Sequence, residues 1–390
     1  MAERIVLVGA GQAAVACAAR LRALSADSLI TVIGSETHLP YQRPPLSKAF
    51  LAGELTIERL ALRPQTWFAD QRIELRTGET VTAIDRDQRL VRLAGGERLA
   101  YDRLVLATGS RARELPASLA TSRSYTLRGI DDALRLRDEL KEGRRVLVIG
   151  GGYVGLEFAA SASKAGLKVT LVEAGPRILG RVAAPQTAEY FRDLHLSRGV
   201  EIREGVGIQS LSETVDGIQA KLSDGQALCV DFVLAGIGAL ANDELAQACG
   251  LACDNGVLVD ELCRSSDPAI YAVGDCATVV DAEGNRWRIE SVHNAIEQGE
   301  TAASAMLGLE PPAKKTPWFW SDQYECKLQI AGLNQGYDRI EVKPGNRPGA
   351  QSVWYYAGEQ LLAVDAINDP VTYMKVRRDF DAQISAAQSV

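Results

Sequence analysis

The chain has 390 residues, of which 46% are hydrophobic and 24% are charged, and its formal net charge is −7. At about 150 residues per domain this length predicts two or three domains, and the composition excludes a disordered or coiled-coil protein. Acidic and basic residues are interleaved, as in Arg135-Leu136-Arg137-Asp138-Glu139, which disfavours nucleic acid as a partner. Every uncharged stretch is shorter than the roughly 18 residues that span a bilayer, so we expect no membrane partner.

The cysteine and histidine content bears on the compartment and on metal binding. Seven cysteines, an odd number, need no disulfide framework, and glycines interrupt the first apolar run too early for a signal peptide, so we expect a cytoplasmic protein. Cys249, Cys253, Cys263 and Cys276 are spaced neither like zinc ligands nor like ferredoxin ligands, and the three histidines are scattered. We expect no metal site.

The first predicted element is a short apolar strand, Ile5–Val8, which runs into a glycine turn and then a helix. Gly9 permits the tight turn, Gly11 lacks a Cβ that would keep a pyrophosphate away, and Ala14 is small enough for the helix and strand to pack closely. The helix N-terminus provides free N–H groups for the phosphates. This pattern predicts a dinucleotide site that includes Gly9, Gly11, Gln12, Ala13 and Ala14.

The second strand, Ile30–Ile33, ends just before Ser35 and Glu36, at about the distance where dinucleotide folds place an acid on the adenosine ribose. We expect Glu36 to be that ribose ligand, with Ser35 as the alternative. The proline-rich segment 39–48 follows and is stiff, so its two cations, Arg43 and Lys48, are candidate cofactor contacts.

The middle of the chain repeats the opening pattern. After a small β region at 81–84, the buried strand 101–109 and a helix at 131–140, the segment Val146–Gly155 forms a second strand and glycine turn. Its next strand, 169–172, ends at Glu173, eighteen residues beyond Gly155, and the later strand 232–238 mirrors Ala107-Thr108-Gly109. Two such units in one chain form an internal repeat and predict two dinucleotide-binding units.

The last third predicts one more carboxylate and a further domain. The strand 269–275 ends at Asp275, and a helix is expected at 294–306. A proline-rich linker at 311–317 leads to residues 318–390, which alternate apolar and polar residues like antiparallel strands and finish in a charged helix. The predicted fold class is α/β, with two Rossmann-like dinucleotide-binding domains and a small C-terminal α+β domain.

Several of these motifs resemble one family. The chain is similar to the FAD-dependent NADH:ferredoxin reductases of bacterial oxygenase systems, of the putidaredoxin reductase and biphenyl dioxygenase reductase type. The resemblance extends over nearly the whole chain. The motifs that carry it are Leu39-Pro40-Tyr41-Gln42-Arg43-Pro44-Pro45-Leu46-Ser47-Lys48, Gly150-Gly151-Gly152-Tyr153-Val154-Gly155-Leu156-Glu157, Ala272-Val273-Gly274-Asp275-Cys276, Arg288-Ile289-Glu290-Ser291-Val292 and Trp318-Phe319-Trp320-Ser321-Asp322-Gln323-Tyr324.

The resemblance implies FAD in the first unit and NADH in the second. It implies an FAD-binding domain at 1–111 and 244–316, an NAD-binding domain at 112–243 and a C-terminal domain at 317–390. Besides the first glycine turn, the FAD contacts implied are Ser35, Glu36, Arg43, Lys48, Val81, Ala107, Thr108, Gly109, Arg128, Asp275 and Val292. The NAD contacts implied are Gly150, Gly152, Tyr153, Val154, Gly155, Glu157, Glu173, Arg181, Gly238 and Glu290.

The resemblance also implies the reaction: hydride passes from NADH to FAD, and single electrons then go to a [2Fe-2S] ferredoxin that feeds a cytochrome P450 or a Rieske-type oxygenase. Lys48 near the flavin, Glu157 as its charge partner and Trp320 at the ferredoxin-docking face are the catalytic candidates. Residues 37–60 contain no cysteine, so no thiol of the disulfide-reductase kind is expected there.

Other functions fit the same sequence. The same fold serves NADH oxidases and rubredoxin reductases. A hypothesis from a different functional class is a redox-responsive signalling flavoprotein of the apoptosis-inducing-factor type. We expect a monomer or weak homodimer whose contact with ferredoxin is transient and electrostatic. Because the chain is net negative, that contact requires a local basic patch, for which Arg63, Arg288 and Lys327 are the candidates.

Overall fold

The computed structural model describes residues 2–388, and its internal contacts divide them into two compact units. The first unit contains residues 2–42, Glu58–Arg111 and Leu240–Lys314. The second contains Arg43–Ile57, Ala112–Ala239 and residues 315–388. The second unit therefore joins most of the predicted NAD-binding and C-terminal domains with a short insert from the predicted FAD-binding domain. The three-domain boundaries given above stay a prediction.

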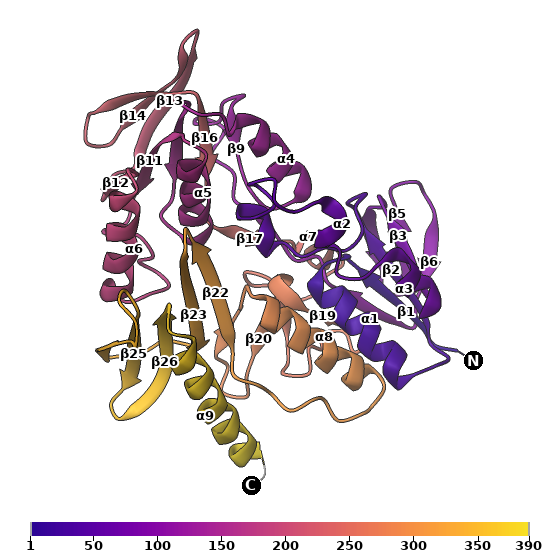
Figure 1. Ribbon diagram of the computed structural model, residues 1–390. Coiled ribbons are helices and arrows are strands. Elements are labelled where there is room, and N and C mark those ends of the chain that lie inside the picture. Colours follow the sequence, from indigo (N-terminus) through magenta and orange to yellow (C-terminus); the bar gives the residue numbers. More distant parts are fainter. Residues whose placement is uncertain (1, 389–390) are drawn as a thin grey trace. The chain divides into compact units, whose positions relative to one another are not determined.

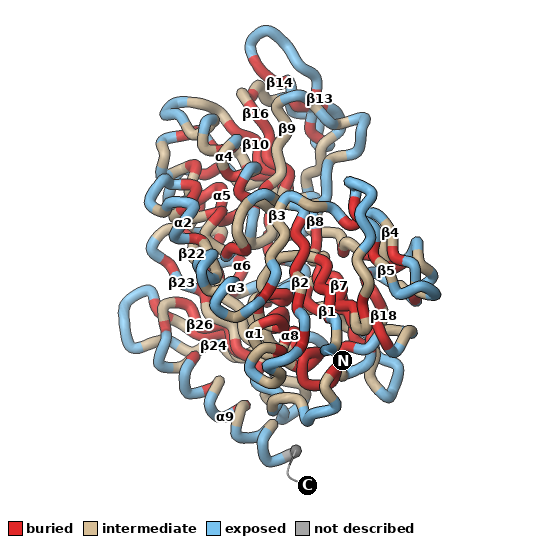
Figure 2. Tube along the Cα trace, turned by 90° about the vertical axis from the view of Figure 1, so that its right-hand side faces the viewer, coloured by how far each residue is buried: buried red, intermediate tan, exposed pale blue. Residues whose placement is uncertain are grey.

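A parallel sheet with strand order β19-β7-β1-β2-β3 forms the centre of the first unit. Its strands are β1 (Arg4–Val8), β2 (Leu29–Gly34), β3 (Ile73–Thr77), β7 (Arg103–Leu106) and β19 (Ile270–Ala272). The strands β1 and β7 are buried along almost their whole length (Figure 2), and β19 is buried throughout, which explains their uninterrupted apolar sequences.

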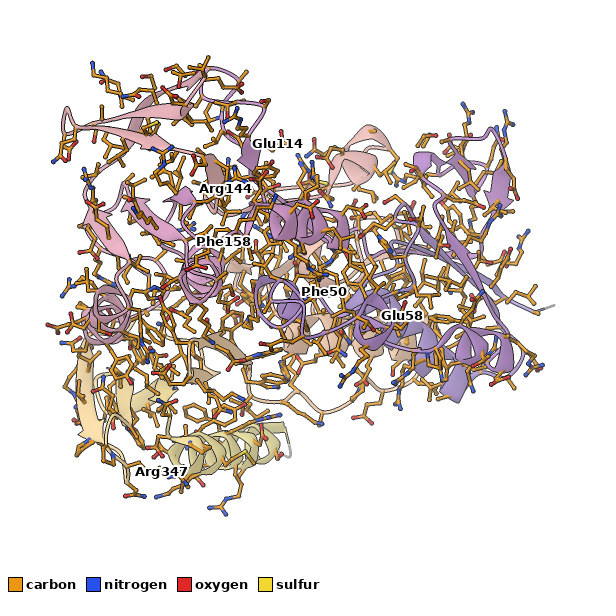
Figure 3. The ribbon with its side chains drawn as sticks, turned by 45° about the horizontal axis from the view of Figure 1, so that its top comes forward. Phe50, Glu58, Glu114, Arg144, Phe158 and Arg347 are labelled. Carbon is orange, nitrogen blue, oxygen red and sulfur yellow. The ribbon has the colours of Figure 1, made fainter. Side chains whose placement is uncertain are left out.

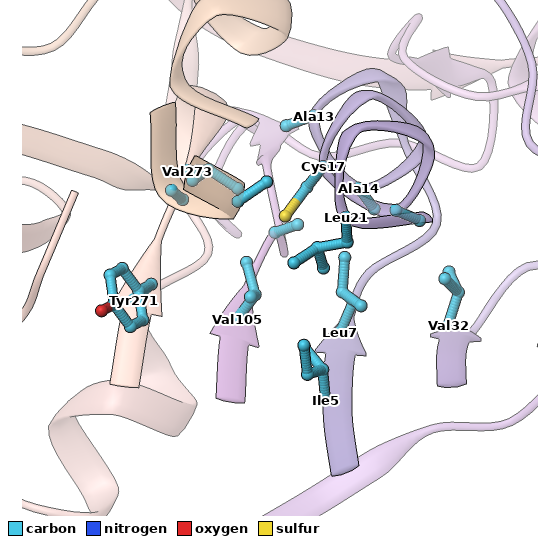
Figure 4. Packing of buried hydrophobic residues seen from close by; sticks show 14 of the residues in the cluster. Ile5, Leu7, Ala13, Ala14, Cys17, Leu21, Val32, Val105, Tyr271 and Val273 are labelled. Carbon is cyan, nitrogen blue, oxygen red and sulfur yellow. The ribbon is translucent and has the colours of Figure 1, made fainter. Parts of the chain in front are cut away.

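Two helices of the first unit, α1 (Gln12–Leu24) and α8 (Val292–Met306), pack against each other (Figure 1). Their close approach depends on Gly299, where a Cβ would lie 2.5 Å from the carbonyl oxygen of Ala13. Figure 4 shows Cys17 and Leu21 of α1 over Leu7 and Val105 of the sheet, all fully buried. This core fixes the helix that follows the first glycine turn.

Smaller elements complete the first unit. Two small sheets have the orders β4-β5-β6, which is antiparallel, and β18-β20-β21, in which β18 pairs with β20 in parallel and β20 with β21 antiparallel. Their strands are β4 (Val81–Asp85), β5 (Leu90–Leu93), β6 (Arg98–Ala100), β18 (Val257–Val259), β20 (Ala277–Val280) and β21 (Arg286–Trp287). The short helices are α3 (Gln65–Asp70), α7 (Glu244–Ala248) and the 3-10 helix η2 (Gly274–Cys276). Three elements contain the positions at which the chain passes from one unit to the other: α2 (Ile57–Leu60), β8 (Ser110–Ala112) and β17 (Ala239–Ala241).

The second unit contains its own parallel sheet, with order β12-β11-β10-β16-β9. Its strands are β9 (Ser124–Tyr125), β10 (Arg145–Ile149), β11 (Lys168–Glu173), β12 (Glu201–Glu204) and β16 (Phe232–Ala235). The helices are α4 (Ile130–Glu139), α5 (Tyr153–Lys164) and α6 (Pro185–Ser197), and an antiparallel sheet is formed by β13 (Ile208–Thr214), β14 (Gly217–Leu222) and β15 (Ala227–Val230). The repeat predicted from the sequence is thus present as two parallel sheets.

Aromatic contacts fix the core and the insert of this unit. Phe158 and Arg144, both labelled in Figure 3, contact Phe232: the Phe158 ring lies edge-on with its centroid 6.4 Å away, and the Arg144 guanidinium lies 5.4 Å from the ring centre. The insert contains the 3-10 helix η1 (Pro44–Ser47) and the buried Phe50, whose carbonyl accepts a hydrogen bond from Arg137. The insert is therefore part of the second unit.

The C-terminal part of the second unit is an antiparallel sheet of order β22-β23-β26-β25-β24, with one long helix, α9 (Pro370–Gln388), against it (Figure 1). The strands are β22 (Trp318–Gln323), β23 (Cys326–Gly332), β24 (Arg339–Pro344), β25 (Gln351–Ala357) and β26 (Gln360–Ile367). Tyr373 and Phe380 of α9 pack on Ala331 and Val364 of the sheet. The α+β fold predicted for this part is confirmed.

Candidate functional sites

The first glycine turn connects β1 to α1. Gly9 has φ +109°, and a Cβ there would lie 2.1 Å from the carbonyl oxygen of Ala107, so only glycine fits. Gly11 is the N-cap of α1, and a Cβ placed on it would have no heavy atom within 4 Å. The space beside Gly11 and the free N–H groups of the helix fit a pyrophosphate. Ala14 is fully buried, in keeping with its predicted packing role.

The second glycine turn, between β10 and α5, has the same geometry. Gly150 has φ +104°, and its Cβ would lie 2.4 Å from the carbonyl oxygen of Gly236. Gly152 is the N-cap of α5 and has open space where a Cβ would be. Gly155 allows the helix to approach the turn, because its Cβ would lie 2.1 Å from the oxygen of Gly150. Each unit thus contains a turn that fits a dinucleotide.

Other predicted FAD contacts gather at the carboxyl edge of the first unit's sheet, where the ligands of parallel sheets bind. Asp275 follows β19 and accepts a hydrogen bond from Ser110 Oγ at 2.9 Å. Thr108 follows β7 and donates to the carbonyl of Asn242 at 2.6 Å. Ala107, Gly109, Val81 and Val292 also belong to this unit.

At the end of β2, the Glu36 carboxylate accepts a hydrogen bond from Tyr41 Oη at 2.5 Å, whereas Ser35 is exposed. Tyr41 thereby fixes the position of one candidate ribose ligand. Which of the two residues binds the ribose stays a prediction.

Two residues predicted to bind FAD, Arg43 and Arg128, belong to the second unit. There the Arg43 guanidinium donates to the Arg128 carbonyl at 2.9 Å.

In the second unit, the Glu173 carboxylate at the end of β11 accepts hydrogen bonds from the backbone N–H groups of Gly151 at 2.7 Å and Gly175 at 2.6 Å. The carboxylate is therefore fixed beside the second glycine turn, where a ribose ligand is expected. Arg181 and Gly238 lie close together, since a Cβ on Gly238 would be 3.6 Å from the Arg181 guanidinium.

Three further residues predicted to bind NAD have different surroundings. Val154 is exposed at the start of α5. The Tyr153 ring packs on Phe319 with centroids 4.8 Å apart, and its buried hydroxyl has no hydrogen-bond partner among the described residues. Glu290 belongs to the first unit rather than the second.

Lys48 and Glu157 form the ion pair that the resemblance implies. Lys48 Nζ lies 2.6 Å from Glu157 Oε2, and the exposed fractions of the two side chains are 18% and 6%. Two hydroxyls also donate to this carboxylate, Ser47 Oγ at 2.5 Å and Ser321 Oγ at 2.7 Å. The pair is therefore embedded in the second unit, where water screens it little.

Sequence reasoning missed both serines. Ser47 follows three apolar or proline positions without a motif of its own. Ser321 had a signal in the alternation of β22, which places Phe319, Ser321 and Gln323 on one face and Trp318 and Trp320 on the other. Trp320 stacks on Trp318 with centroids 5.3 Å apart and is partly exposed.

The interpretation of Arg288 as a cation for a partner needs correction. Its side chain is only 10% exposed, and its guanidinium donates to the carbonyl of Asp275 at 3.0 Å and to Glu290 at 2.6 Å. The carboxylate neutralises it, so it adds little positive potential at the surface. Arg63 and Lys327 are exposed as expected.

All seven cysteines are free thiols. Burial raises the pKa of Cys17 and of Cys263, so neither is a ready nucleophile. Over residues 2–388, no set of three or more His, Cys, Asp or Glu side chains is placed to hold a metal ion. Over the same range, no helix has the length and apolar character needed to cross a membrane.

Comparison with known proteins identifies the class. A family model described as pyridine nucleotide-disulphide oxidoreductase matches residues 3–299, and one described as reductase C-terminal matches residues 318–390. The chain therefore belongs to the pyridine nucleotide-disulphide oxidoreductase family and is an oxidoreductase.

Individual relatives narrow the class. Putidaredoxin reductase from Pseudomonas putida is 45% identical over 95% of this chain and 90% of its own length. The ferredoxin–NAD(+) reductase component of the anthranilate 1,2-dioxygenase system from Burkholderia cepacia is 40% identical over 94% of this chain and 91% of its own. A crystal structure of the covalent putidaredoxin reductase–putidaredoxin complex matches with a TM-score of 0.93 at 43% identity, covering 97% of this chain and 93% of that one. The resemblance inferred from the motifs is confirmed.

Proposed function

We propose that this chain is an FAD-dependent NADH:ferredoxin reductase that supplies electrons to a [2Fe-2S] ferredoxin, which feeds a cytochrome P450 or a Rieske-type oxygenase. The observation that carries the proposal is the pair of matching glycine turns, one in each unit, in a chain whose relatives are ferredoxin reductases. The solved complex of one relative with putidaredoxin supports a ferredoxin as the partner.

FAD and NADH are the cofactors of this chain. When bound, FAD supplies chemistry that no side chain has, because it takes up two electrons as a hydride and gives them up singly. In the first unit, the turn at Gly9 and Gly11 would hold the FAD pyrophosphate at the N-terminus of α1, and Asp275 would accept hydrogen bonds from ribityl hydroxyls.

In the second unit, the turn at Gly150 and Gly152 would hold the NADH pyrophosphate. Glu173 would accept the ribose hydroxyls of NADH and repel the 2′-phosphate of NADPH. A preference for NADH follows, and comparable catalytic efficiencies with the two coenzymes would contradict it.

Lys48 and Glu157 are the proposed catalytic pair. A fixed cation on the reacting edge of a flavin favours the electron-rich reduced state, and Glu157 holds the cation in place. The same carboxylate would orient the nicotinamide amide, which is a hydrogen-bond donor. Trp320 is proposed for the ferredoxin-docking face, because the resemblance implies that position and its ring on β22 is partly exposed.

The cytoplasm is the compartment we propose. Free cysteines throughout the chain are typical of proteins in reducing compartments, and the NADH that the reaction consumes is made there.

The rival functions differ in their electron acceptor. The test uses purified, FAD-loaded protein with NADH and, in turn, a [2Fe-2S] ferredoxin, rubredoxin, oxygen and a disulfide. We expect fast turnover with at least one [2Fe-2S] ferredoxin and slow turnover with oxygen. Fast oxygen consumption with no ferredoxin reduction would identify an NADH oxidase, a rubredoxin preference would identify a rubredoxin reductase, and a long-lived reduced complex with NAD would favour the signalling protein.

A further inference from the structure

A buried chain of hydrogen bonds leads away from the catalytic pair. Glu157 Oε1 accepts from Ser321 Oγ at 2.7 Å, and Ser321 Oγ lies 3.2 Å from Gln323 Nε2. Gln323 Oε1 lies 2.9 Å from His195 Nε2, and His195 Nδ1 lies 3.5 Å from Tyr324 Oη. Ser321, Gln323 and His195 have no exposed surface at all, so water does not compete for these bonds.

The donors and acceptors fix the direction of every hydrogen bond in this series. An ionised carboxylate only accepts, so the Ser321 hydroxyl donates to Glu157 and uses its lone pair for an amide N–H of Gln323. The Gln323 amide therefore turns its oxygen toward His195, which must donate from Nε2. Each bond points toward Glu157, and the opposite side of that carboxylate faces the Lys48 ammonium.

His195 is suited to this role because it stays neutral. Burial lowers the pKa of His195 to about 4, so near pH 7 the ring has one N–H, at Nε2, and an acceptor at Nδ1. Two uncharged side chains contact the ring: Gln323, which bonds Nε2 at 2.9 Å, and Tyr324, whose ring centroid is 5.1 Å away.

We propose that Ser321, Gln323 and His195 are positioning residues that hold the Glu157 carboxylate in the orientation needed by Lys48 and the nicotinamide. The inference rests on the proposed function and adds three residues to its machinery. Without the Ser321 hydroxyl, Glu157 Oε1 is left buried with no donor, which is costly, and the carboxylate turns toward Lys48 and Ser47. The alternation of β22 places Ser321 and Gln323 on one face for this purpose.

A double-mutant cycle tests whether the residues act in series. In FAD-loaded protein, Ser321→Ala should slow the reduction of flavin by NADH about tenfold, the effect of one lost hydrogen bond to a charged group. Gln323→Leu should slow it less. The double variant should be no slower than Ser321→Ala alone, because Gln323 acts through Ser321.

The matched control is Ser352→Ala in β25. Ser352 is also buried in the C-terminal sheet, but its hydroxyl accepts from Trp354 Nε1 at 2.9 Å and has no bond to Glu157. The Ser352→Ala variant should reduce its flavin with NADH at a rate within about twofold of the wild type. Additive slowing by Ser321→Ala and Gln323→Leu, or equal slowing by Ser352→Ala, would mean that these residues only pack the core and would overturn the inference.

A second measurement needs neither NADH nor a variant of the network. The chain has three histidines, so ¹⁵N-histidine NMR of the FAD-loaded protein gives few signals, and those of His38 and His293 are identified by His38→Gln and His293→Gln. We expect His195 at pH 6 to be neutral with its proton on Nε2. A proton on Nδ1, or a charged ring at pH 6, would overturn the inference. Failure to reduce ferredoxin would instead count against the proposed function alone.

Discussion

At the residue scale, Lys48 is the side chain whose role can be tested most simply. Lys48→Met keeps the length of the side chain and removes the charge that faces Glu157 at 2.6 Å. We expect flavin reduction by NADH to slow at least about tenfold, because the carboxylate loses its cation and the positive charge proposed for the flavin edge is removed. Stopped-flow absorbance under anaerobic conditions measures this rate.

The exposed Lys221 of β14 provides the control for that variant. Lys221→Met makes the same change on the surface of the same unit and should leave the rate unaltered. A wild-type rate in Lys48→Met would show that Lys48 only forms a structural ion pair.

A second residue, Asp365, predicts a pH dependence of stability. It is fully buried in the second unit and accepts hydrogen bonds from Tyr355 and Thr187, and burial raises its pKa to about 6, above the ordinary value of 3.8. Between these pH values the folded state holds a proton that the unfolded chain has released. The contribution of Asp365 to the free energy of unfolding therefore falls as pH rises from about 4 to 6, by roughly 3 kcal/mol at most, and is constant above that.

Asp365→Asn removes this titration. The free energy of unfolding of the variant, relative to that of the wild type, should rise between pH 4.5 and pH 6.5, as measured by urea melts at both values. His195, whose lowered pKa acts in the opposite direction, is common to both proteins and cancels. Parallel pH profiles would show that Asp365 is not protonated in the folded state.

Some single residues could be predicted from the sequence and others could not. The glycines of both turns and the Lys48–Glu157 pair were predicted because spacing or a motif identifies them, and the structure places them as stated, although their binding roles stay predictions. The bonding partners of Ser321 and His195 could not be predicted, since they are 164 and 128 residues away along the chain. Arg288 was misjudged because its neutralising contacts are formed only on folding.

At the scale of elements, the two glycines of the first turn should separate folding from cofactor binding. Gly9→Ala brings a Cβ to 2.1 Å from a backbone oxygen at φ +109°, so we expect a loss of more than about 3 kcal/mol in stability. Gly11→Ala meets no atom within 4 Å and should melt like the wild type without FAD. Its methyl group occupies the space proposed for the pyrophosphate, so FAD affinity should fall at least about tenfold.

Thermal melts of the apoprotein and flavin fluorescence titrations measure the two effects. Gly11→Ala protein that binds FAD as tightly as the wild type would contradict the proposed site.

The strand β22 allows a test of the proposed ferredoxin-docking face. Trp320→Ala should slow the reduction of ferredoxin about tenfold and leave the reduction of ferricyanide intact, because a small acceptor needs no docking surface. We expect Trp318→Ala to act on stability instead. The Trp318 ring packs against α9 with Arg377 over it, so its removal should lower the melting temperature. Equal loss of both activities in Trp320→Ala would make Trp320 structural.

The elements themselves were largely predictable. Apolar strands followed by glycine turns identify both parallel sheets, and the alternation after residue 318 identifies the C-terminal antiparallel sheet. The sequence could not show that the insert Arg43–Ile57 packs with the second unit, since this depends on distant contacts such as the bond from Arg137 to the carbonyl of Phe50.

At the scale of the whole molecule, the net charge of −7 predicts how association depends on salt. An acidic ferredoxin must be attracted by local cations, for which the exposed Arg63 and Lys327 remain candidates. Ferredoxin-dependent turnover should fall as salt shortens the screening length from about 30 Å to about 10 Å, whereas NADH–ferricyanide activity should change little. Steady-state assays over this range measure both, and a salt-independent ferredoxin rate would exclude electrostatic docking.

We expect electrons to leave this protein singly, for an iron–sulfur partner. The most direct measurement mixes FAD-loaded protein, one equivalent of NADH and an excess of an oxidised [2Fe-2S] ferredoxin without oxygen, and follows the ferredoxin absorbance. We expect two equivalents of ferredoxin to be reduced for each NADH, at a rate fast enough to support turnover. Reduced flavin that persists beside oxidised ferredoxin, across a panel of such ferredoxins, would contradict it.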